Sequence, residues 1–403
     1  MNRVKLGDFI EQYGDGIHGT PNYDDNGMYY FVNGNNLING RIQITDETLK
    51  VTEEEYEKIK RPLSDNTLLL SINGTLGRVA VYNGEKIALG KSACYLNIKN
   101  NKNKYFVKGV LDTQEFQKYI QLVAHGSTIK NLAPSQVVEY EFNSPNEGGQ
   151  EKIAFLLKLI DDKIDNNNEI NTQLEAMART IYDYWFLQFD FPDESGKPYK
   201  SSGGKMVWNE ELKKELPEGW RVGNLSEIAS ITMGSSPKGE SLNEDKDGIT
   251  FYQGKTDFGY RFPMARVYTK SPIRYAEVND ILLSVRAPVG DMNITVEKCC
   301  IGRGLAAIHS HYQSFLFYLM LRNQHQFDKY NNKGTTFGAI TKDELIGLRV
   351  VIPNEAIIKT FDNKISDLDK RIFSNELQNQ ELISLRDFLL PLLMNGQVGF
   401  REC

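Results

Sequence analysis

The feature that most constrains the fold of this chain is a single internal repeat, in which the second half of the sequence follows the first at a separation of about 210 residues. Residues 69–77 (LLSINGTLG) correspond to residues 282–290 (LLSVRAPVG). Three more pairs of segments match in the same order: 31–34 with 251–254, 126–128 with 334–336, and 145–147 with 353–355. Stacked repeat proteins have periods of roughly 20–50 residues. The sequence therefore indicates the duplication of a whole domain.

Each copy divides into a globular module and a helix. The 403 residues leave room for two or three domains of roughly 150 residues each. We predict a first module at 1–148, a central spacer helix at 149–190, a second module at 191–355 and a C-terminal spacer helix at 356–403. The predicted fold class is α+β: two tandem mixed α/β modules, related by an internal pseudo-two-fold repeat, and two long antiparallel helices that form a coiled coil.

Short apolar runs that end at turn-forming residues indicate the strands of the modules. Buried strands are predicted at 68–72 and 281–285. Residues 79–82, followed by Asn83–Gly84, carry the signal of a β-hairpin. Helices are predicted at 112–123 and 312–329.

Both spacer helices carry an apolar stripe in which residues recur at separations of three, four or sums of these, the spacing of one helix face. The first stripe consists of Ile153, Leu157, Ile160, Ile164, Leu174, Ile181 and Trp185. The second repeats it 208 residues later with Phe361, Ile365, Leu368, Ile372, Leu382 and Leu389.

Asparagine interrupts both stripes at the same two positions, with Asn167 and Asn171 in the first helix and Asn375 and Asn379 in the second. A buried asparagine lowers the stability of a coiled coil but fixes its register. We therefore predict that these four residues form a polar part of the seam between the helices. The alternative is that they turn toward solvent.

The composition is typical of a folded soluble chain, with 40% apolar and 25% charged residues. The longest apolar runs are far shorter than the roughly 18 residues that a membrane span needs. Residues 1–8 contain no apolar core of a signal peptide. The four cysteines include no CxxC pair, as expected in a reducing compartment. We therefore expect a cytoplasmic protein that does not contact a membrane.

The net charge of −6 is unevenly distributed. The two helical segments carry 10 basic and 15 acidic residues, so that the modules are nearly neutral. Residues 255–303 are locally basic, with eight Lys or Arg against five Asp or Glu. A nearly neutral surface with a few placed cations binds DNA only weakly by itself, because phosphate contacts supply most of the affinity.

Three near-motifs for catalysis or cofactor binding do not meet their requirements. Residues 84–92 (GEKIALGKS) place five residues between the glycines, where a phosphate-binding loop has four. Residues 302–307 fit only the loose dinucleotide pattern, whose second glycine is missing in the first module. His309 and His311 lack a cysteine or carboxylate cluster nearby that would complete a metal site. The sequence predicts a non-catalytic binding protein without a metal.

The chain resembles the specificity subunit of type I restriction-modification enzymes over essentially its whole length. The segments that carry the resemblance are 217–229 (PEGWRVGNLSEIA), 287–290 (APVG), 126–128 (GST), the runs into the helices at 145–164 and 353–372, and the closing 389–396 (LLPLLMNG). The first module departs from the pattern, because it starts at 4–8 (VKLGD) without the Pro-Glu-Gly-Trp lead. The tail at 400–403 is also unusual.

The resemblance implies that each module is a target recognition domain for one half of a split site in double-stranded DNA. The helices would set the unread gap and dock two methyltransferase subunits, which bind S-adenosylmethionine and modify adenine N6. A restriction and motor subunit would use ATP and Mg to translocate and cut unmodified DNA. This chain would be non-catalytic and carry no cofactor, since base flipping and chemistry belong to the partners.

Residues that read DNA should differ between the copies, whereas residues that hold the fold should agree. Asn33 aligns with Gln253, and Asn35 with Lys255. Asn and Gln suit adenine edges, and Lys and Arg suit guanine or phosphate. The candidate base readers are Asn33, Asn35, Asn36, Gln253, Lys255 and Arg286.

Cations and hydroxyls that both copies retain are better candidates for phosphate contacts, which position the protein without reading sequence. These candidates are Lys91 with Arg303, Ser127 and Thr128 with Thr335 and Thr336, and Lys130. The alternative for every candidate of either kind is a solvated loop residue.

Two other functions remain open from the residues alone. One is a free-standing two-module DNA-binding regulator, which tight specific binding by the purified chain would favour. The other is a coiled-coil scaffold with protein-binding modules, which would bind its partners without the steep salt dependence of phosphate contacts.

Overall fold

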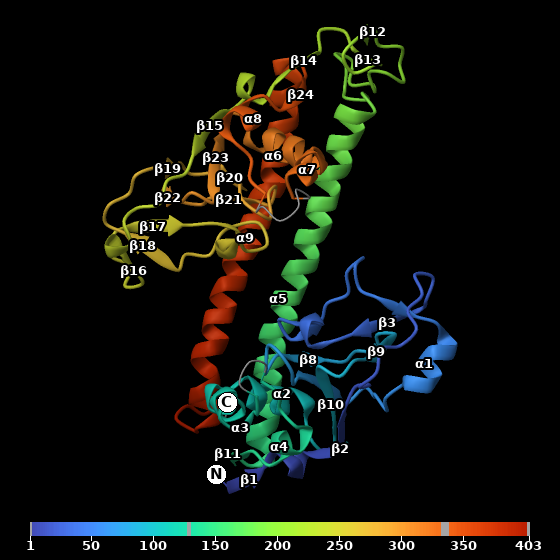
Figure 1. Cartoon of the computed structure of the whole chain (residues 1–403), viewed down its shortest axis with the longest axis vertical. Coiled ribbons are helices and arrows are strands. Elements are labelled where there is room, and N and C mark those ends of the chain that lie inside the picture. The colour runs from blue at the N-terminus through green and yellow to red at the C-terminus, as the bar shows by residue number, and fades with distance from the viewer. Residues whose placement is uncertain (1, 127–129, 332–337, 401–403) are drawn as a thin grey trace. The chain divides into compact units, whose positions relative to one another are not determined.

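The computed structural model of the chain describes residues 2–126, 130–331 and 338–400 (Figure 1). The chain forms two compact units: unit 1 contains residues 1–165 and 379–403, and unit 2 contains residues 166–378. The long helices α5 (Glu147–Tyr182) and α9 (Glu355–Met394) each contribute to both units. The predicted spacer helices begin at 149 and 356, close to where α5 and α9 begin.

Unit 1 is built around a four-stranded antiparallel sheet of order β2-β10-β7-β8 and a three-stranded sheet of order β6-β3-β9. Its remaining strands form the pairs β1-β11 and β4-β5. The strands are β1 (Asn2–Lys5), β2 (Ile10–Asp15), β3 (Tyr29–Val32), β4 (Leu37–Ile38), β5 (Arg41–Ile42), β6 (Lys50–Val51), β7 (Thr67–Ser71), β8 (Val79–Val81), β9 (Ile87–Leu89), β10 (Ala93–Ile98) and β11 (Glu141–Ser144). The helices are α1 (Glu53–Ile59), α2 (Lys104–Asp112), α3 (Gln114–Val123) and α4 (Pro134–Val138).

Unit 2 repeats this plan with a four-stranded sheet of order β15-β23-β20-β21 and a five-stranded sheet of order β16-β18-β17-β22-β19. The pairs β14-β24 and β12-β13 complete it. The strands are β12 (Met206–Asn209), β13 (Lys214–Pro217), β14 (Arg221–Asn224), β15 (Ser230–Met233), β16 (Leu242–Asn243), β17 (Ile249–Tyr252), β18 (Val267–Thr269), β19 (Tyr275–Ala276), β20 (Ile281–Ser284), β21 (Met292–Ile294), β22 (Cys299–Ile301), β23 (Leu305–His309) and β24 (Arg349–Ile352). The helices are α6 (Gln313–Arg322), α7 (Asp328–Asn331) and α8 (Lys342–Ile346).

The repeat seen in the sequence is a repeat of topology. Strands β2, β7, β8 and β10 occupy the same places in their sheet as β15, β20, β21 and β23. In the second sheet of each unit, one pair runs parallel, β3 with β9 and β17 with β22, whereas the other pairs of these sheets are antiparallel. The predicted α+β class with two tandem modules is confirmed.

The turn that follows the central strand makes the same serine hydrogen bonds in the two modules. The hydroxyl of each serine donates to the carbonyl four residues later and accepts the amide N–H seven residues later, at 2.6 and 2.8 Å for Ser71 and at 2.7 and 2.9 Å for Ser284. The turns end at Gly77 (φ 86°) and Gly290 (φ 106°), whose left-handed backbone favours glycine. This explains why the serine and the glycine recur in both copies.

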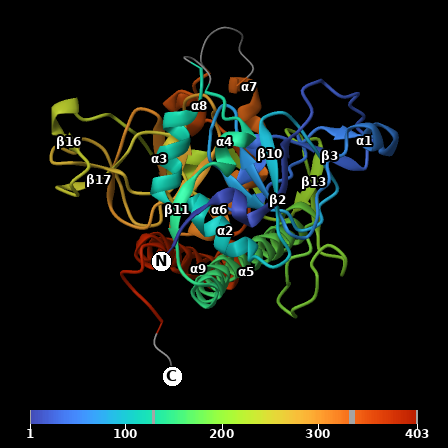
Figure 2. The same ribbon diagram turned by 90° about the horizontal axis from the view of Figure 1, so that it is seen from below.

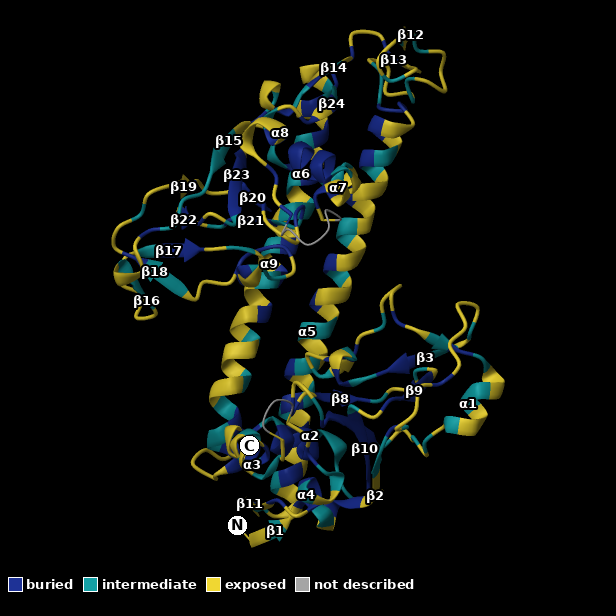
Figure 3. Ribbon diagram, viewed as in Figure 1, coloured by how far each residue is buried: buried dark blue, intermediate teal, exposed yellow. Residues whose placement is uncertain are grey.

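Burial follows the predicted strands, and the core of each unit extends onto its helices. Leu68, Leu70 and Leu283 are fully buried, and Figure 3 colours β10 as buried along its length. In unit 1, α2 lies against α5 (Figures 1 and 2). Gly109 allows this approach, because a Cβ there would meet Leu157 Cδ1 at 2.6 Å.

Two local predictions from the sequence are wrong. The hairpin at Asn83–Gly84 does not form, because β8 pairs with β7 and β9 pairs with β3 in the other sheet. The turn signal was real, since Gly84 has φ 88°, but it joins two sheets. The helix predicted at 312–329 is interrupted at Asn323, where α6 ends and a 3-10 turn begins.

The four asparagines of the helix stripes are all buried. Within unit 2, α5 and α9 run antiparallel, and the Nδ2 of Asn375 donates to the Oδ1 of Asn171 at 2.8 Å. Asn171 in turn donates from Nδ2 to Glu376 Oε1 at 2.9 Å, and Asn167 donates to Gln378 Oε1 at 2.9 Å. Apolar side chains surround this segment, including Ile372 and Ala178.

Glu376 is the acidic end of this hydrogen-bonded chain. Burial raises the pKa of its carboxyl above the ordinary value of 4.5, and the hydrogen bond from Asn171 opposes that rise. The ionised form is therefore disfavoured in the folded state, so Glu376 reduces stability at neutral pH.

The two central amides of the seam should be energetically coupled. Asn375→Leu alone leaves the buried Asn171 Oδ1 without its donor and should lower the free energy of unfolding by about 1–3 kcal/mol. Adding Asn171→Leu should recover part of that loss, because leucine fits an apolar seam although Glu376 loses its donor. Chemical denaturation of the two single variants and the double variant measures the coupling, and additive effects would contradict it.

Replacing Glu376 with Gln should stabilise the chain at neutral pH, because Gln keeps the acceptor for Asn171 and removes the half-buried charge. The gain should be roughly 0.5 kcal/mol, a small value because solvent screens a partly exposed group. It should disappear as the pH falls through 4.5, where the wild-type carboxyl is protonated in both states. Thermal unfolding between pH 4 and pH 8 checks the sign, and a gain that does not change with pH would exclude this cause.

Candidate nucleic-acid interface

In unit 1, four loops meet where β3, β7 and β9 end, and we call this surface loop edge 1. It consists of residues 16–20, 33–36, 72–76 and 90–92. Backbone hydrogen bonds join the loops: Ile17 N to Leu89 O (2.8 Å), Gly90 N to Val32 O (2.8 Å) and Ile72 N to Ser92 O (2.9 Å). The parallel pairing of β3 and β9 is what brings both carboxyl ends, and therefore both loops, to the same edge.

Loop edge 1 contains three of the predicted base readers and one predicted phosphate contact. Asn35 and Lys91 are exposed. Asn33 is partly buried, and its Oδ1 accepts a hydrogen bond from Ser92 Oγ at 2.9 Å. Asn36 uses both ends of its amide inside the loop: Oδ1 accepts the N–H of Asn33 at 2.9 Å, and Nδ2 donates to Gln43 O at 3.1 Å. Asn35 therefore has the most accessible amide of the three.

The corresponding surface of unit 2, loop edge 2, lies where β17, β20 and β22 end. It consists of residues 234–238, 253–257, 285–289 and 302–304. Backbone hydrogen bonds again join the loops: Ser235 N to Ile301 O (2.9 Å), Gly302 N to Tyr252 O (2.8 Å) and Val285 N to Gly304 O (2.9 Å). The predicted residues Gln253, Lys255, Arg286 and Arg303 all belong to it.

The side chains of loop edge 2 differ in how free they are to meet a ligand. Gln253, Arg286 and Arg303 are exposed. Lys255 forms an ion pair with Asp291, at 2.7 Å between Nζ and Oδ2. A half-exposed ion pair of this kind is worth about 0–1 kcal/mol, so a phosphate could compete for the ammonium group.

The segment between the strand and the 3-10 turn that follows it is one residue longer after β17 than after β3. The strands align Phe31 with Phe251, but the 3-10 turns that follow are Gly34–Asn36 and Lys255–Asp257. The turn therefore aligns Asn36 with Asp257, one position later than the strands do. The sequence comparison missed this shift because it carried the strand alignment through the loop.

Five of the predicted phosphate contacts lie outside the two loop edges or outside the described residues. Lys130 folds back onto α3, where its Nζ donates to the carbonyl and the Oε1 of Gln121 at 2.9 and 3.0 Å. Ser127, Thr128, Thr335 and Thr336 lie outside the residues that the structure describes.

Sequence reasoning missed Asn73, which occupies in loop edge 1 the place of Arg286 in loop edge 2. Each residue follows the buried central strand, and each forms a backbone bridge to a later segment, Asn73 with Asn131 and Arg286 with Ala339. The signal was present, because the repeat aligns the two residues and their chemistry differs.

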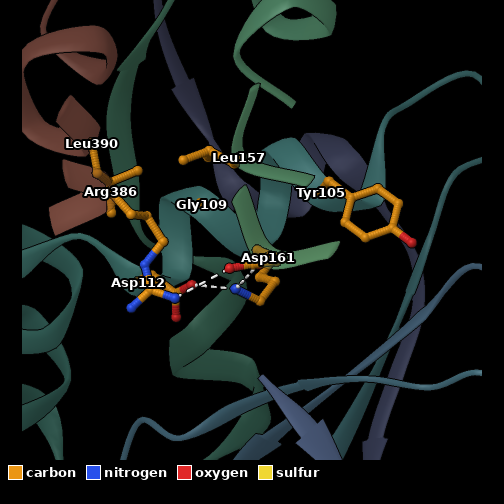
Figure 4. Close-up of a pocket in the computed structure, with 8 residues that line it drawn as sticks. Tyr105, Gly109, Asp112, Leu157, Asp161, Arg386 and Leu390 are labelled. Carbon is orange, nitrogen blue, oxygen red and sulfur yellow. Dashed lines mark hydrogen bonds and ion pairs between the residues drawn. The ribbon is translucent and has the colours of Figure 1, made fainter. Parts of the chain in front are cut away.

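A buried ion cluster ties module 1 to the helices within unit 1. Lys108 of α2 is buried, and its Nζ pairs with Asp112 at 2.8 Å and with Asp161 of α5 at 3.0 Å. Arg386 of α9 reaches the same Asp161 at 3.1 Å. Figure 4 shows Asp112, Asp161 and Arg386 turned toward one another around a small pocket.

The cations of this cluster remain charged. Burial lowers the pKa of Lys108, but Asp112 and Asp161 more than offset that effect and raise it above 10.5. Burial likewise lowers the pKa of Arg386, and Asp161 with Asp387 raises it overall. Because a buried pair that loses one partner costs about 3–5 kcal/mol, the cluster constrains how module 1 packs on its helices.

Unit 2 has the same arrangement with other residues. Asp369 of α9, which stands 208 residues after Asp161, pairs with the fully buried Arg261 at 2.7 Å. Tyr318 and Ser314 donate their hydroxyl hydrogens to Asp369 at 3.1 and 2.5 Å. Burial lowers the pKa of Arg261, but Asp369 and Tyr318 raise it overall. A carboxylate at the same helix position therefore anchors each module.

Two further observations concern the part of the chain that the structure describes. No three His, Cys, Asp or Glu side chains there lie close enough together to hold a metal ion. None of the helices in those residues is long and apolar enough to cross a membrane.

Comparison with known proteins identifies the module. Residues 1–176 and 217–385 match the family described as the type I restriction modification DNA specificity domain. The MjaX specificity subunit of a type I restriction enzyme of Methanocaldococcus jannaschii is 28% identical, over 98% of this chain and 92% of that protein. The MjaIX specificity subunit of the same organism is 26% identical, over 90% and 84%.

A solved structure has the same fold. The crystal structure of the type I restriction-modification S subunit from M. genitalium covers all of this chain and 96% of its own, with a TM-score of 0.58 at 18% identity. Two family matches, one in each copy of the repeat, account for most of the sequence. The chain therefore belongs to the family of type I restriction-modification DNA specificity proteins.

Proposed function

We propose that this chain is the DNA-recognition subunit of a type I restriction-modification complex, in which each module reads one half of a bipartite site. The observation that supports this most is the contrast between scaffold and loops. The turns at Ser71 and Ser284 make the same serine hydrogen bonds, whereas the exposed side chains on the two loop edges differ, with Asn35 on one and Gln253 and Arg286 on the other. Two half-sites of different sequence require such a pair of surfaces.

Direct readout would come from exposed amide and guanidinium groups. The amide of Asn35 or Gln253 suits an adenine edge, and Arg286 suits guanine. Lys91 and Arg303, at matching places in the two edges, would hold the phosphates. The amides of Asn33 and Asn36 form hydrogen bonds within the protein, so we expect them to contribute less to base readout.

The chain would perform no catalysis itself. Methyl transfer to adenine N6 would belong to two methyltransferase subunits that bind S-adenosylmethionine, and cleavage to ATP- and Mg-dependent restriction subunits. The complex would act in the cytoplasm on double-stranded DNA. Nearly neutral modules support this division, since binding by this chain alone would have little of the phosphate attraction that gives DNA-binding proteins their affinity. A free-standing regulator is for this reason not favoured.

The helices offer surface for the methyltransferase partners. On the unit 1 parts of α5 and α9, five large apolar side chains remain exposed: Phe155, Leu159, Ile383, Leu385 and Phe388. Burying such side chains in an interface contributes about 25 cal/mol per Å² of apolar area. We propose that these helices dock the methyltransferase subunits.

The gene should determine a methylation pattern. Genomic DNA from cells with and without it is compared by single-molecule sequencing for N6-methyladenine. A split motif with an unread gap, methylated only in the presence of the gene, is the expected result. If no motif depends on the gene, even in cells from which a methyltransferase co-purifies with the chain, the proposed function is wrong.

Single substitutions on the two loop edges should alter one half-site each. Asn35→Ala should relax only the half-site read by module 1, and Gln253→Ala only the other, with roughly tenfold or greater loss of discrimination at one base pair. Each variant serves as the control for the other in the same methylation assay. Relaxation of both half-sites by either substitution would argue against independent modules.

A further inference from the structure

A buried carboxylate, that of Asp257, lies beneath the exposed residues of loop edge 2, where it cannot contact a ligand directly. Asp257 is 5% exposed. Its Oδ2 accepts the backbone N–H of Gln253 at 2.7 Å and that of Gly254 at 3.3 Å. The carboxylate thus holds the chain at the point where it leaves β17, immediately before the exposed side chains of the turn.

The other oxygen of Asp257 has a cationic partner. Arg266 Nη2 donates to Asp257 Oδ1 at 2.5 Å and to Thr256 O at 2.9 Å. The arginine side chain is about half exposed, whereas the carboxylate it meets is almost completely buried. An ionised carboxylate is costly to bury without a charge partner. Arg266 therefore allows Asp257 to bind the backbone of the turn in its charged form.

In module 1 a neutral side chain holds the backbone at the corresponding turn. Asn36 is the counterpart of Asp257 in the 3-10 turn, and its Oδ1 accepts the backbone N–H of Asn33 at 2.9 Å. The turn itself is the same, because Asn36 N donates to Asn33 O at 2.9 Å and Asp257 N donates to Gly254 O at 3.1 Å. A neutral amide needs no cation. The Nδ2 of Asn36 donates instead to the backbone carbonyl of Gln43.

We propose that Asp257, neutralised by Arg266, is a positioning residue that aims the base-reading segment of module 2, and that Asn36 has this role in module 1. The inference rests on the proposed function and deepens it, because it names residues that determine specificity without touching DNA. Asn36, first considered as a base reader, thereby acts through the backbone of its neighbours.

Exchanging charge for amide gives a direct test. Arg266→Ala leaves the buried carboxylate without its cation. The backbone that orients Gln253 and Lys255 should then lose its fixed conformation. Asp257→Asn keeps an oxygen for the backbone N–H groups of Gln253 and Gly254, and the half-exposed Arg266 can turn away from the new Nδ2 donor, so recognition should be preserved. The double variant Asp257→Asn/Arg266→Ala should also preserve it, since a neutral amide needs no cation beside it.

The readout is the N6-methyladenine pattern of cells that assemble the complete complex with each variant. For Arg266→Ala, methylation at sites with a correct first half and an incorrect second half should rise about tenfold or more relative to correct sites. The first half-site is the internal control, because its recognition should not change in any variant. Lys270→Ala, which removes the exposed ion pair with Asp247 in the same module, is the matched control and should resemble wild type.

The outcomes separate the two proposals. If wild type gives no gene-dependent bipartite motif, the proposed function fails. If wild type gives the motif but Arg266→Ala leaves the second half-site unchanged, the positioning role is overturned. The role is also overturned if the double variant is as impaired as Arg266→Ala, or if both half-sites are lost together, which would show a general loss of folding. Relaxation of the second half-site alone, with rescue by Asp257→Asn, establishes it.

Discussion

A charge buried inside a protein must meet an opposite charge or strong hydrogen-bond partners, and in each unit a buried cation, Lys108 or Arg261, meets this requirement at a spacer helix. Asp161 on α5 and Asp369 on α9 stand at equivalent helix positions, and each pairs with a cation of the module packed beside it. The partners differ, since Lys108 and Arg386 serve the first and Arg261 the second. What is shared is the constraint: a module that shifted on its helix would leave a buried charge uncompensated.

The two modules combine the same arrangement of strands and serine turns with different exposed side chains. The parallel strand pair of each module sends two loops to one edge, and the serine-centred turn adds a third. Frame residues recur in both copies because their hydrogen bonds are made to backbone. Exposed residues at matching places, such as Lys91 with Arg303, keep their charge where phosphate contact is proposed, and others change where base contact is proposed.

Much of the fold could be predicted because it depends on patterns that the sequence displays directly. The duplication, the apolar stripes and the central strands at 68–72 and 281–285 follow from periodicity and from comparison of the halves. The hairpin at Asn83–Gly84 could not be predicted correctly, because a turn signal does not reveal which sheet the next strand joins. The ion clusters were also out of reach, since Lys108 and Asp161 are 53 residues apart and carry no periodic signal.

The candidate site was predictable in its location and less so in its detail. The repeat pointed to Asn33, Asn35, Gln253 and Arg286, and the structure gathers these residues on one edge of each module. Whether a polar side chain faces outward depends on its local bonds, as with Asn36, whose amide is used within its own loop. The segment between strand and 3-10 turn is one residue longer in module 2, and this shifts the alignment of the two copies among the candidate base readers. The shift is visible only when the 3-10 turns themselves are compared.

The turn that ends each central strand has a consequence for how such proteins diversify. The hydrogen bonds of Ser71 and Ser284 do not involve the side chain of the residue at 73 or 286, which joins a later segment through its backbone. That residue is asparagine in one copy and arginine in the other, between the same serine and glycine. A substitution there that keeps the backbone bridge leaves the serine hydrogen bonds in place, so it should avoid much of the destabilisation that filters most changes.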